Sequence, residues 1–231
     1  MHKYQIDELI SYCRMSQMDL KAKLENELPE GREVINQDGF LYSSGTHPVL
    51  LVAHLDTVHE DNRGLPSKIN TNENGHLSCP EGIGGDDRCG VFIIMEIIKQ
   101  LGCHVLFCED EEKHGIGATK FTESGITPNV QFIVEFDRKG KDDCVFYGCN
   151  NPDFIKLVEQ YGFNFNTGSF SDISIIAPHL EIAAVNLSSG YYNAHRSDEI
   201  ICPDDITSII ERSIPLIRDV STPYKYIPRQ Q

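Results

Sequence analysis

The sequence predicts a three-layer α/β/α protein with a mixed, mostly parallel central sheet. Apolar runs of strand length alternate with amphipathic segments of helical length along most of the 231 residues. Strands that are apolar throughout are typical of an α/β sheet that is covered by helices on both faces. No internal repeat, low-complexity stretch or linker divides the chain, so we expect residues 1–231 to form a single domain.

The composition is that of a folded, acidic protein. Hydrophobic residues make up 40% of the chain, and 20 Lys and Arg against 35 Asp and Glu give a net charge of −15. Nucleic-acid binding needs clustered Lys and Arg, so this charge argues against it. No run approaches the ~20 apolar residues of a membrane span, and the N-terminus is not a signal sequence. We therefore expect a cytoplasmic protein with no membrane partner.

The N-terminal part predicts a helix followed by a hairpin. Residues 5–27 carry apolar side chains at approximately helical spacing, which predicts one helix. Two short β-like runs follow at residues 33–35 and 40–42. Between them, Asp38-Gly39 is a strong turn signal, so the two runs are predicted to pair as a hairpin.

The rest of the chain alternates between strands and helices. Four apolar runs predict strands at residues 49–53, 104–108, 132–136 and 182–187. Four helices are predicted between and after these strands, at residues 88–101, 116–124, 152–161 and 203–213. Pro215 is expected to end or kink the last helix, because proline cannot donate a backbone hydrogen bond.

Histidines and carboxylates follow each predicted strand. His54 follows the first strand, residues 109–112 the second, Asp137 the third, and His195 comes shortly after the fourth. Ligands of open α/β sheets bind beyond the carboxyl ends of the strands, so these side chains are predicted to meet in one crevice. The pair 86–87, in GIGGDDRCG just before a helix, is a fifth candidate segment.

Such a set of ligands suits a metal ion. Two histidines and at least three carboxylates favour Zn²⁺, with Mn²⁺ or Co²⁺ as alternatives. His54 and Asp56 are two residues apart on an extended segment, so their side chains point to the same side. Asp56 can therefore orient the His54 ring as a hydrogen-bond acceptor.

Five motifs in this order resemble the co-catalytic dizinc exopeptidases. That superfamily includes peptidase T-like tripeptidases, glutamyl and leucyl aminopeptidases and related amino-acid deacylases. The motifs are HLDTV at 54–58, GDDRCG at 85–90, DEE at 110–112 followed by GA at 117–118, Asp137, and NAHRSDE at 193–199. The resemblance implies the α/β/α fold of these zinc exopeptidases.

The resemblance also implies a role for each residue of the cluster. Two Zn²⁺ ions would share Asp86, with His54 and Asp137 completing one site and Glu112 and His195 the other. Glu111 would be the general base that takes a proton from a metal-bound water. The peptide bond between Asp86 and Asp87 would be cis.

The implied function is a metal-dependent exopeptidase, foremost an aminopeptidase, acting on a peptide. An N-acyl amino acid deacylase or a carboxypeptidase with the same dizinc site is the alternative, and a catalytically silent metal- or peptide-binding relative is an alternative of another class. Larger relatives carry a second, lid domain. The gaps between Asp56 and Asp86 and between Asp137 and His195 are too short for one, so we expect the catalytic domain alone.

Some assignments have alternatives. A shift of register would make Asp110 rather than Glu111 the base. Arg88 and Arg138 could each bind a substrate carboxylate or form a structural salt bridge. One of residues 191–193 is expected to supply part of the polar contact that the lid provides in the larger relatives.

Overall fold

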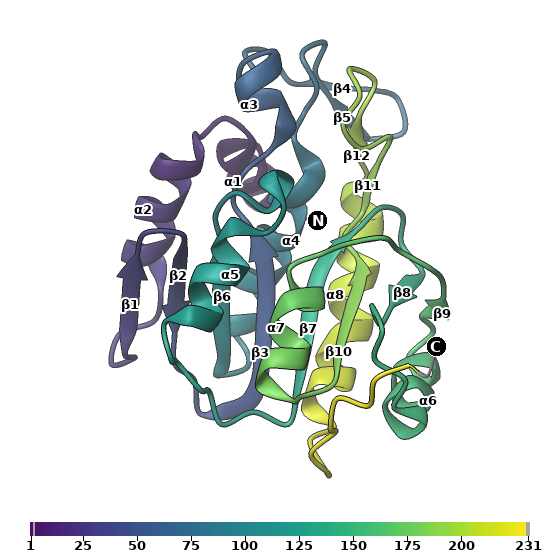
Figure 1. Ribbon diagram of the computed structural model, residues 1–231. Coiled ribbons are helices and arrows are strands. Elements are labelled where there is room, and N and C mark those ends of the chain that lie inside the picture. Colours follow the sequence, from purple (N-terminus) through teal and green to yellow (C-terminus); the bar gives the residue numbers. More distant parts are fainter. Residues whose placement is uncertain (2, 230–231) are drawn as a thin grey trace.

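An eight-stranded sheet, in the order β1-β2-β6-β3-β7-β10-β8-β9, lies at the centre of the computed structural model, which describes residues 1 and 3–229 (Figure 1). Its parallel core consists of β6 (Cys103–Cys108), β3 (His47–His54), β7 (Phe132–Arg138) and β10 (Ala184–Ser188). Antiparallel pairings join this core to β2 (Phe40–Ser43), which pairs with β1 (Val34–Gln37), and to β8 (Asp143–Val145), which pairs in parallel with β9 (Asn164–Phe165). The predicted mixed, mostly parallel sheet is confirmed.

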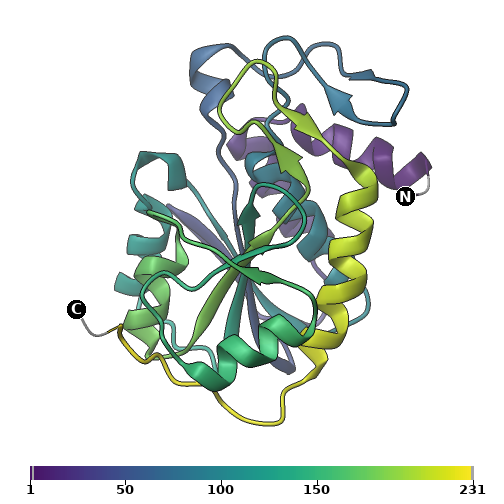
Figure 2. The ribbon, with the colours of Figure 1, turned by 90° about the vertical axis from the view of Figure 1, so that its right-hand side faces the viewer.

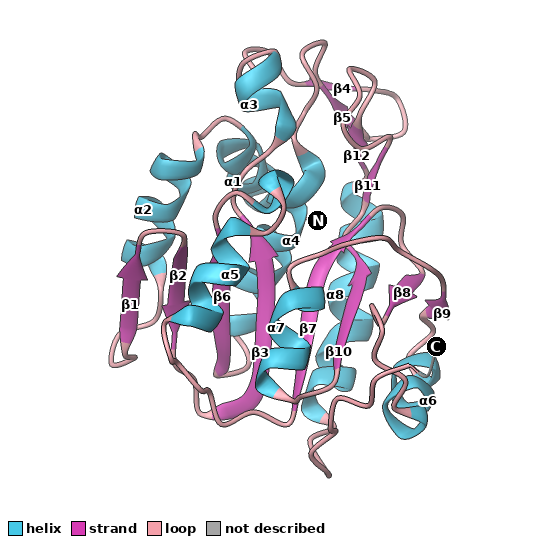
Figure 3. Ribbon diagram, viewed as in Figure 1, coloured by secondary structure: helices cyan, strands magenta, loops and turns pink. Residues whose placement is uncertain are grey.

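Helices cover both faces of this sheet (Figures 2 and 3). One face carries α5 (Ile116–Glu123) and α7 (Ile173–Leu180), and the other carries α1 (Lys3–Cys13), α4 (Gly85–Ile98) and α8 (Pro203–Arg218). The remaining helices are α2 (Gln17–Glu27), α3 (Val58–Asn62) and α6 (Pro152–Gln160). The three layers therefore match the predicted fold class.

The central strands are mainly apolar on both faces because alternate side chains enter different cores. On β3, Val49, Leu51 and Ala53 belong to the buried cluster beneath α1, α4 and α8. Leu50 and Val52 belong to a second buried cluster beneath α5 and α7. Successive strand residues point to opposite faces, so both sets must be hydrophobic when both faces are covered.

The single N-terminal helix predicted over residues 5–27 is wrong, since the structure has α1 and α2 with a turn between them. Ser16 begins α2, and its hydroxyl accepts a hydrogen bond from the Asp19 amide at 3.1 Å. Serine at this position stabilises a new helix start. The buried Arg88 guanidinium also donates to the carbonyls of Tyr12 and Met15, which supports the end of α1.

The predicted hairpin is confirmed, with Val34 opposite Ser43 and Gln37 opposite Phe40. The predicted end of the last helix is wrong, because α8 continues through Pro215 to Arg218. Leu216 and Ile217 are fully buried, so packing holds this last turn against the core. Helices α3 and α7 were not predicted; α7 combines β-branched residues with Pro178, which are weak helix signals.

A second, smaller sheet lies beyond the carboxyl ends of the parallel strands (Figure 1). It contains β11 (Tyr191–Tyr192), β12 (Ile200–Ile201), β5 (Leu77–Ser78) and β4 (Asn70–Thr71), in that order. Strands β11 and β12 pair antiparallel, so residues 193–199 form a hairpin loop. That loop carries His195 toward the end of the main sheet.

All eight cysteines are free and buried. Among the residues that the structure describes, no helix combines the length and the apolar character needed to cross a membrane.

Candidate metal centre

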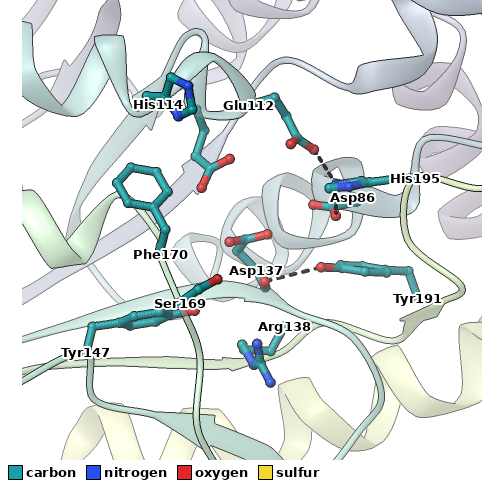
Figure 4. Close-up of a pocket in the computed structure, with 11 residues that line it drawn as sticks. Asp86, Glu112, His114, Asp137, Arg138, Tyr147, Ser169, Phe170, Tyr191 and His195 are labelled. Carbon is teal, nitrogen blue, oxygen red and sulfur yellow. Dashed lines mark hydrogen bonds and ion pairs between the residues drawn. The ribbon is translucent and has the colours of Figure 1, made fainter.

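A pocket of about 320 Å³ opens at the carboxyl ends of the parallel strands (Figure 4). Side chains from four separate segments line it together: Asp86, Glu111, Glu112, Asp137 and His195. His54 is buried next to this pocket, within 3.4 Å of Asp86 and Asp137. The predicted convergence of these six side chains is therefore present in the structure.

The carboxylate of Asp86 lies between two groups of possible ligands. Its Oδ1 lies 3.1 Å from His54 Nε2, and Asp137 Oδ1 lies 3.4 Å from the same nitrogen. Its Oδ2 lies 3.1 Å from His195 Nε2, which in turn lies 2.6 Å from Glu112 Oε1. Each group offers ligand atoms within 4.8 Å of one another, as one metal ion requires.

Asp56 fixes the geometry on one side of this cluster. Its Oδ1 lies 3.1 Å from His54 Nδ1 and accepts from the Glu111 amide, while Oδ2 accepts from the Glu112 amide, both at 3.0 Å. Burial alone would raise the pKa of Asp56, but its hydrogen bonds, first that from His54, keep the pKa below its usual value. Asp56 therefore orients the His54 ring and also holds the acidic loop.

The loop after β6 settles which acidic residue faces the pocket. Glu111 and Glu112 line the pocket, whereas Asp110 turns away to accept from Gln17 Nε2 at 3.4 Å and to pair with Lys113 at 3.1 Å. Glu111 is 8% exposed and also lies within ligand distance of His54 and Glu112. The register therefore places Glu111, and not Asp110, at the cluster.

Glu199 stabilises the turn that carries Asp86. The Asp86-Asp87 peptide bond is cis. Glu199 is fully buried and accepts from the amides of Gly84 at 2.9 Å and Asp86 at 3.1 Å, and it pairs with His59 Nε2 at 2.7 Å. Sequence reasoning gave Glu199 no role, although it is the last residue of the motif around His195. Its signal was an acidic residue directly before the apolar pair of β12.

A second set of buried polar residues supports Asp137. Asn186 on β10 accepts from the Asp137 amide at 2.8 Å and donates to Asp137 Oδ2 at 3.3 Å. It also donates to Ser171 Oγ at 3.1 Å, and Ser171 donates to the fully buried Glu135. Sequence reasoning missed this chain of contacts. A glutamate inside the apolar run of β7, two residues before Asp137 and on the same face, was its visible signal.

Asp172 adds a further buried carboxyl group at the start of α7. It is fully buried, and its side chain contacts the thiol of Cys108. Burial raises its pKa to about 7. Burial likewise raises the pKa of Glu135 well above its usual value, with Asp137 and Asp172 adding to the rise.

The cluster perturbs the titration of its own members in both directions. Burial raises the pKa of Glu111 to about 9 and that of Asp137 to about 7, and neighbouring carboxylates contribute to both shifts. For Asp86, hydrogen bonds from His195 and His54 outweigh burial and lower the pKa. The nearby carboxylates, first Asp86 and then Glu112, raise the pKa of His195 to about 10. Such divided shifts are typical of functional sites.

The donor set fits a pair of divalent cations. Glu112 Oε1 is buried and makes no hydrogen bond with a described residue, although His195 Nε2 lies only 2.6 Å away. Both atoms can donate a lone pair to a metal ion, and they lie close enough together to bind the same ion. A divalent cation would also offset the repulsion among the carboxylates. Imidazole and carboxylate ligands in sets of three suit Zn²⁺ and leave a position open for water.

One of residues 191–193 was expected to supply a polar contact at the site, and the structure shows which of them lies there. Among residues 191–193, only Tyr191 lines the pocket, where its hydroxyl donates to the Asp137 carbonyl at 3.2 Å. Tyr192 donates to Asp205, and Asn193 donates to the carbonyl of Asp198. Of these three residues, Tyr191 is therefore the candidate for a polar contact with the substrate.

Arg88 lies outside the pocket. It is fully buried, and its guanidinium donates to four backbone carbonyl groups: those of Tyr12, Met15, Leu55 and Asp56. These contacts make Arg88 a structural residue, and they leave Arg138 as the candidate for a substrate carboxylate.

Comparison with known proteins identifies the fold. No protein-family model matches the sequence, and a search of curated proteins finds no match. Among solved structures, aminopeptidase PepT from Bacillus cereus is similar with a TM-score of 0.73 at 14% identity, over 94% of this chain and 98% of that chain. A tripeptidase from Staphylococcus aureus has a TM-score of 0.72 at 14% identity, over 93% of this chain and 97% of that chain. Glutaminyl cyclase from Porphyromonas gingivalis has a TM-score of 0.64 at 13% identity, over 93% of this chain and 95% of that chain. The chain therefore has an aminopeptidase-like fold, on which more than one chemistry occurs.

Proposed function

We propose that this protein is a metal-dependent exopeptidase of the aminopeptidase type, with a site for two Zn²⁺ ions. The observation that carries the proposal is the position of Asp86, whose two carboxylate oxygens face different groups of ligands. His54 and Asp137 would complete one site, and Glu112 and His195 the other. The substrate would be a peptide, or an N-acyl amino acid if the enzyme is a deacylase.

The protein's own residues have distinct tasks in this proposal. When bound, the ions lower the pKa of a water and polarise the scissile carbonyl group. Glu111 is the general base: its carboxylate takes the proton of the attacking water and delivers it to the leaving amine. Asp56 acts through the backbone, because its hydrogen bonds to the amides of Glu111 and Glu112 fix the base relative to His54.

We also propose that the chain is a catalytic domain without a lid. The segment between Asp137 and His195 is used for β8, α6, β9, α7, β10 and β11, all of which belong to the two sheets and their helices. Tyr191 would then supply one of the polar contacts that line the open side of the pocket.

Two measurements test the proposal. The first incubates the zinc-loaded protein with a mixed peptide library and with N-acetyl amino acids and identifies the products by mass spectrometry. Loss of single N-terminal residues is expected, whereas products from the acylated set alone would reject the peptidase in favour of a deacylase. The second determines bound zinc, which should approach two ions per chain.

Glu111→Gln provides the control for catalysis. We expect it to keep both ions and to lose about 10²- to 10⁴-fold in kcat, the range typical of a general base. If wild type and Glu111→Gln both bound two ions and neither turned over any substrate, the protein would be a silent metal-binding relative.

A further inference from the structure

A single arginine lies in a pocket that is lined by four carboxylates. Among the residues described as lining it, Arg138 is the single arginine or lysine, whereas four carboxylates line the same space. The whole chain carries a net charge of −15, so anions are repelled at long range. The position of Arg138 in this pocket therefore suggests that it binds an anionic group.

Arg138 is incompletely used by the protein itself. Its side chain is 17% exposed, and its Nη2 reaches Asp143 Oδ2 at 3.4 Å and the Thr167 carbonyl at 3.5 Å, both at the outer limit of hydrogen bonding. Its Nε is buried without a hydrogen-bond partner among the described residues. Asp143 in turn accepts a shorter bond of 2.7 Å from Asn166. Arg138 also donates to the hydroxyl of Tyr147, but it lacks the four carbonyl acceptors that Arg88 has, so its guanidinium keeps N–H groups for another acceptor.

Tyr147 forms the wall of the pocket next to Arg138. Tyr147 lines the same pocket and has a backbone φ of 38°, which is a rare conformation for a bulky residue. A side chain at Gly168 would come within 2.8 Å of the Tyr147 ring, so only glycine leaves room for the ring there. Ser169 and Phe170 complete this side, opposite Glu112 and His195 (Figure 4).

We propose that Arg138 is a specificity residue that binds a carboxylate of the substrate. The inference rests on the proposed hydrolase function and adds the substrate class to it. Arg138 follows Asp137 directly, and adjacent residues lie only 3.8 Å apart along the backbone. Arg138 also lines the same pocket as Asp86 and His195, so we expect the carboxylate to belong to a residue next to the scissile bond. It is either the α-carboxylate of a dipeptide or N-acyl amino acid, or the acidic side chain of the residue that is removed.

Paired substrates that differ only in the carboxylate test this assignment. The pairs are Leu-Gly and Leu-Gly amide, glutamyl and glutaminyl 4-nitroanilide, and N-acetyl-leucine and N-acetyl-leucinamide. In wild type, the acid of at least one pair should have a kcat/KM roughly 10- to 100-fold above that of its amide, the range expected for charge-assisted hydrogen bonds. The pair that responds identifies the position of the carboxylate.

Arg138→Met should remove this preference by lowering kcat/KM for the acid and leaving that of the amide unchanged. Arg138→Lys should restore it in part, since lysine keeps the charge and loses the planar fork. Lys139→Met is the matched control, because Lys139 is exposed and does not line the pocket. It removes the same charge and should keep the preference. An equal loss for acid and amide in Arg138→Met would show a structural role and overturn the assignment.

Direct binding separates this inference from the proposed function. Calorimetry measures the same pairs on zinc-loaded Glu111→Gln protein with and without Arg138→Met, so that no turnover is required. Tighter binding of one acid, lost with Arg138→Met, supports the inference even if wild type hydrolyses nothing, and in that case the exopeptidase is rejected. Equal or absent binding of acids and amides overturns the role of Arg138, whatever the hydrolytic activity.

Discussion

Replacing Arg88 with methionine tests how much the buried guanidinium stabilises the protein. In wild type it donates to the carbonyl oxygens of Tyr12 at 3.3 Å, Met15 at 3.0 Å and Asp56 at 3.1 Å, and also to that of Leu55. Tyr12 keeps a second donor, the Met15 amide. The substitution therefore leaves three acceptors short of a partner, at about 1 kcal/mol each, or about 3 kcal/mol in total.

Urea denaturation, followed by circular dichroism, measures this loss. For a chain of this size the dependence on urea is about 3 kcal/mol per M, so the midpoint should fall by about 1 M. Arg88→Lys should recover only part of the loss, because one ammonium group cannot reach all four carbonyls. Arg14→Met, at an exposed arginine nearby, should shift stability by less than about 0.5 kcal/mol. The reasoning is refuted if Arg88→Met unfolds at the wild-type urea concentration, or if it only raises the KM for acidic substrates.

Three further changes test the site and the core. Asp56→Asn should weaken zinc binding about 10- to 100-fold in competition with a chelator, since it disturbs the contacts to His54 and the acidic loop; unchanged affinity would contradict this. Asn186→Ala removes the donor and the acceptor that hold Asp137, so the same assay should show weaker binding, while a loss of stability alone would make Asn186 merely structural. Burial lowers the pKa of His104 in the folded state, so the unfolded chain takes up its proton first. The free energy of unfolding should therefore fall as the pH drops below about 6.5, by at most about 1.4 kcal/mol per pH unit for this group. Urea unfolding at pH 7 and pH 5 measures this fall, which should be smaller in His104→Gln than in wild type.

The strands and the site cluster were predictable because their signals are local. Each core strand is a mainly apolar run, and most of the chemical groups lie at its carboxyl end or directly after it. Parallel strands place their carboxyl ends at one edge, so His54, the acidic loop and Asp137 had to meet once the fold class was known. His195 was harder to place, because it arrives through the hairpin of the small sheet, whose two-residue strands carry almost no sequence signal.

The features that escaped prediction depend on contacts between distant residues. The break between α1 and α2 depends partly on Arg88, more than 70 residues away in sequence. The end of α8 depends on the burial of Leu216 and Ile217, which outweighs the effect of Pro215. The buried chain from Glu135 to Asn186 joins β7 to β10, so its members could not be recognised as partners before the strands were placed side by side.

Arg88 also connects the N-terminal helices to the candidate metal centre. Its guanidinium holds the end of α1 and, on the other side, the carbonyls of Leu55 and Asp56 directly after β3. The side chain of Asp56 then fixes the His54 ring and the amides that carry Glu111 and Glu112. A displacement of α1 would therefore move the acceptor that orients both a ligand and the proposed base. This chain of contacts explains why a fully buried cation, costly to desolvate, lies next to the cluster and yet takes no part in lining its pocket.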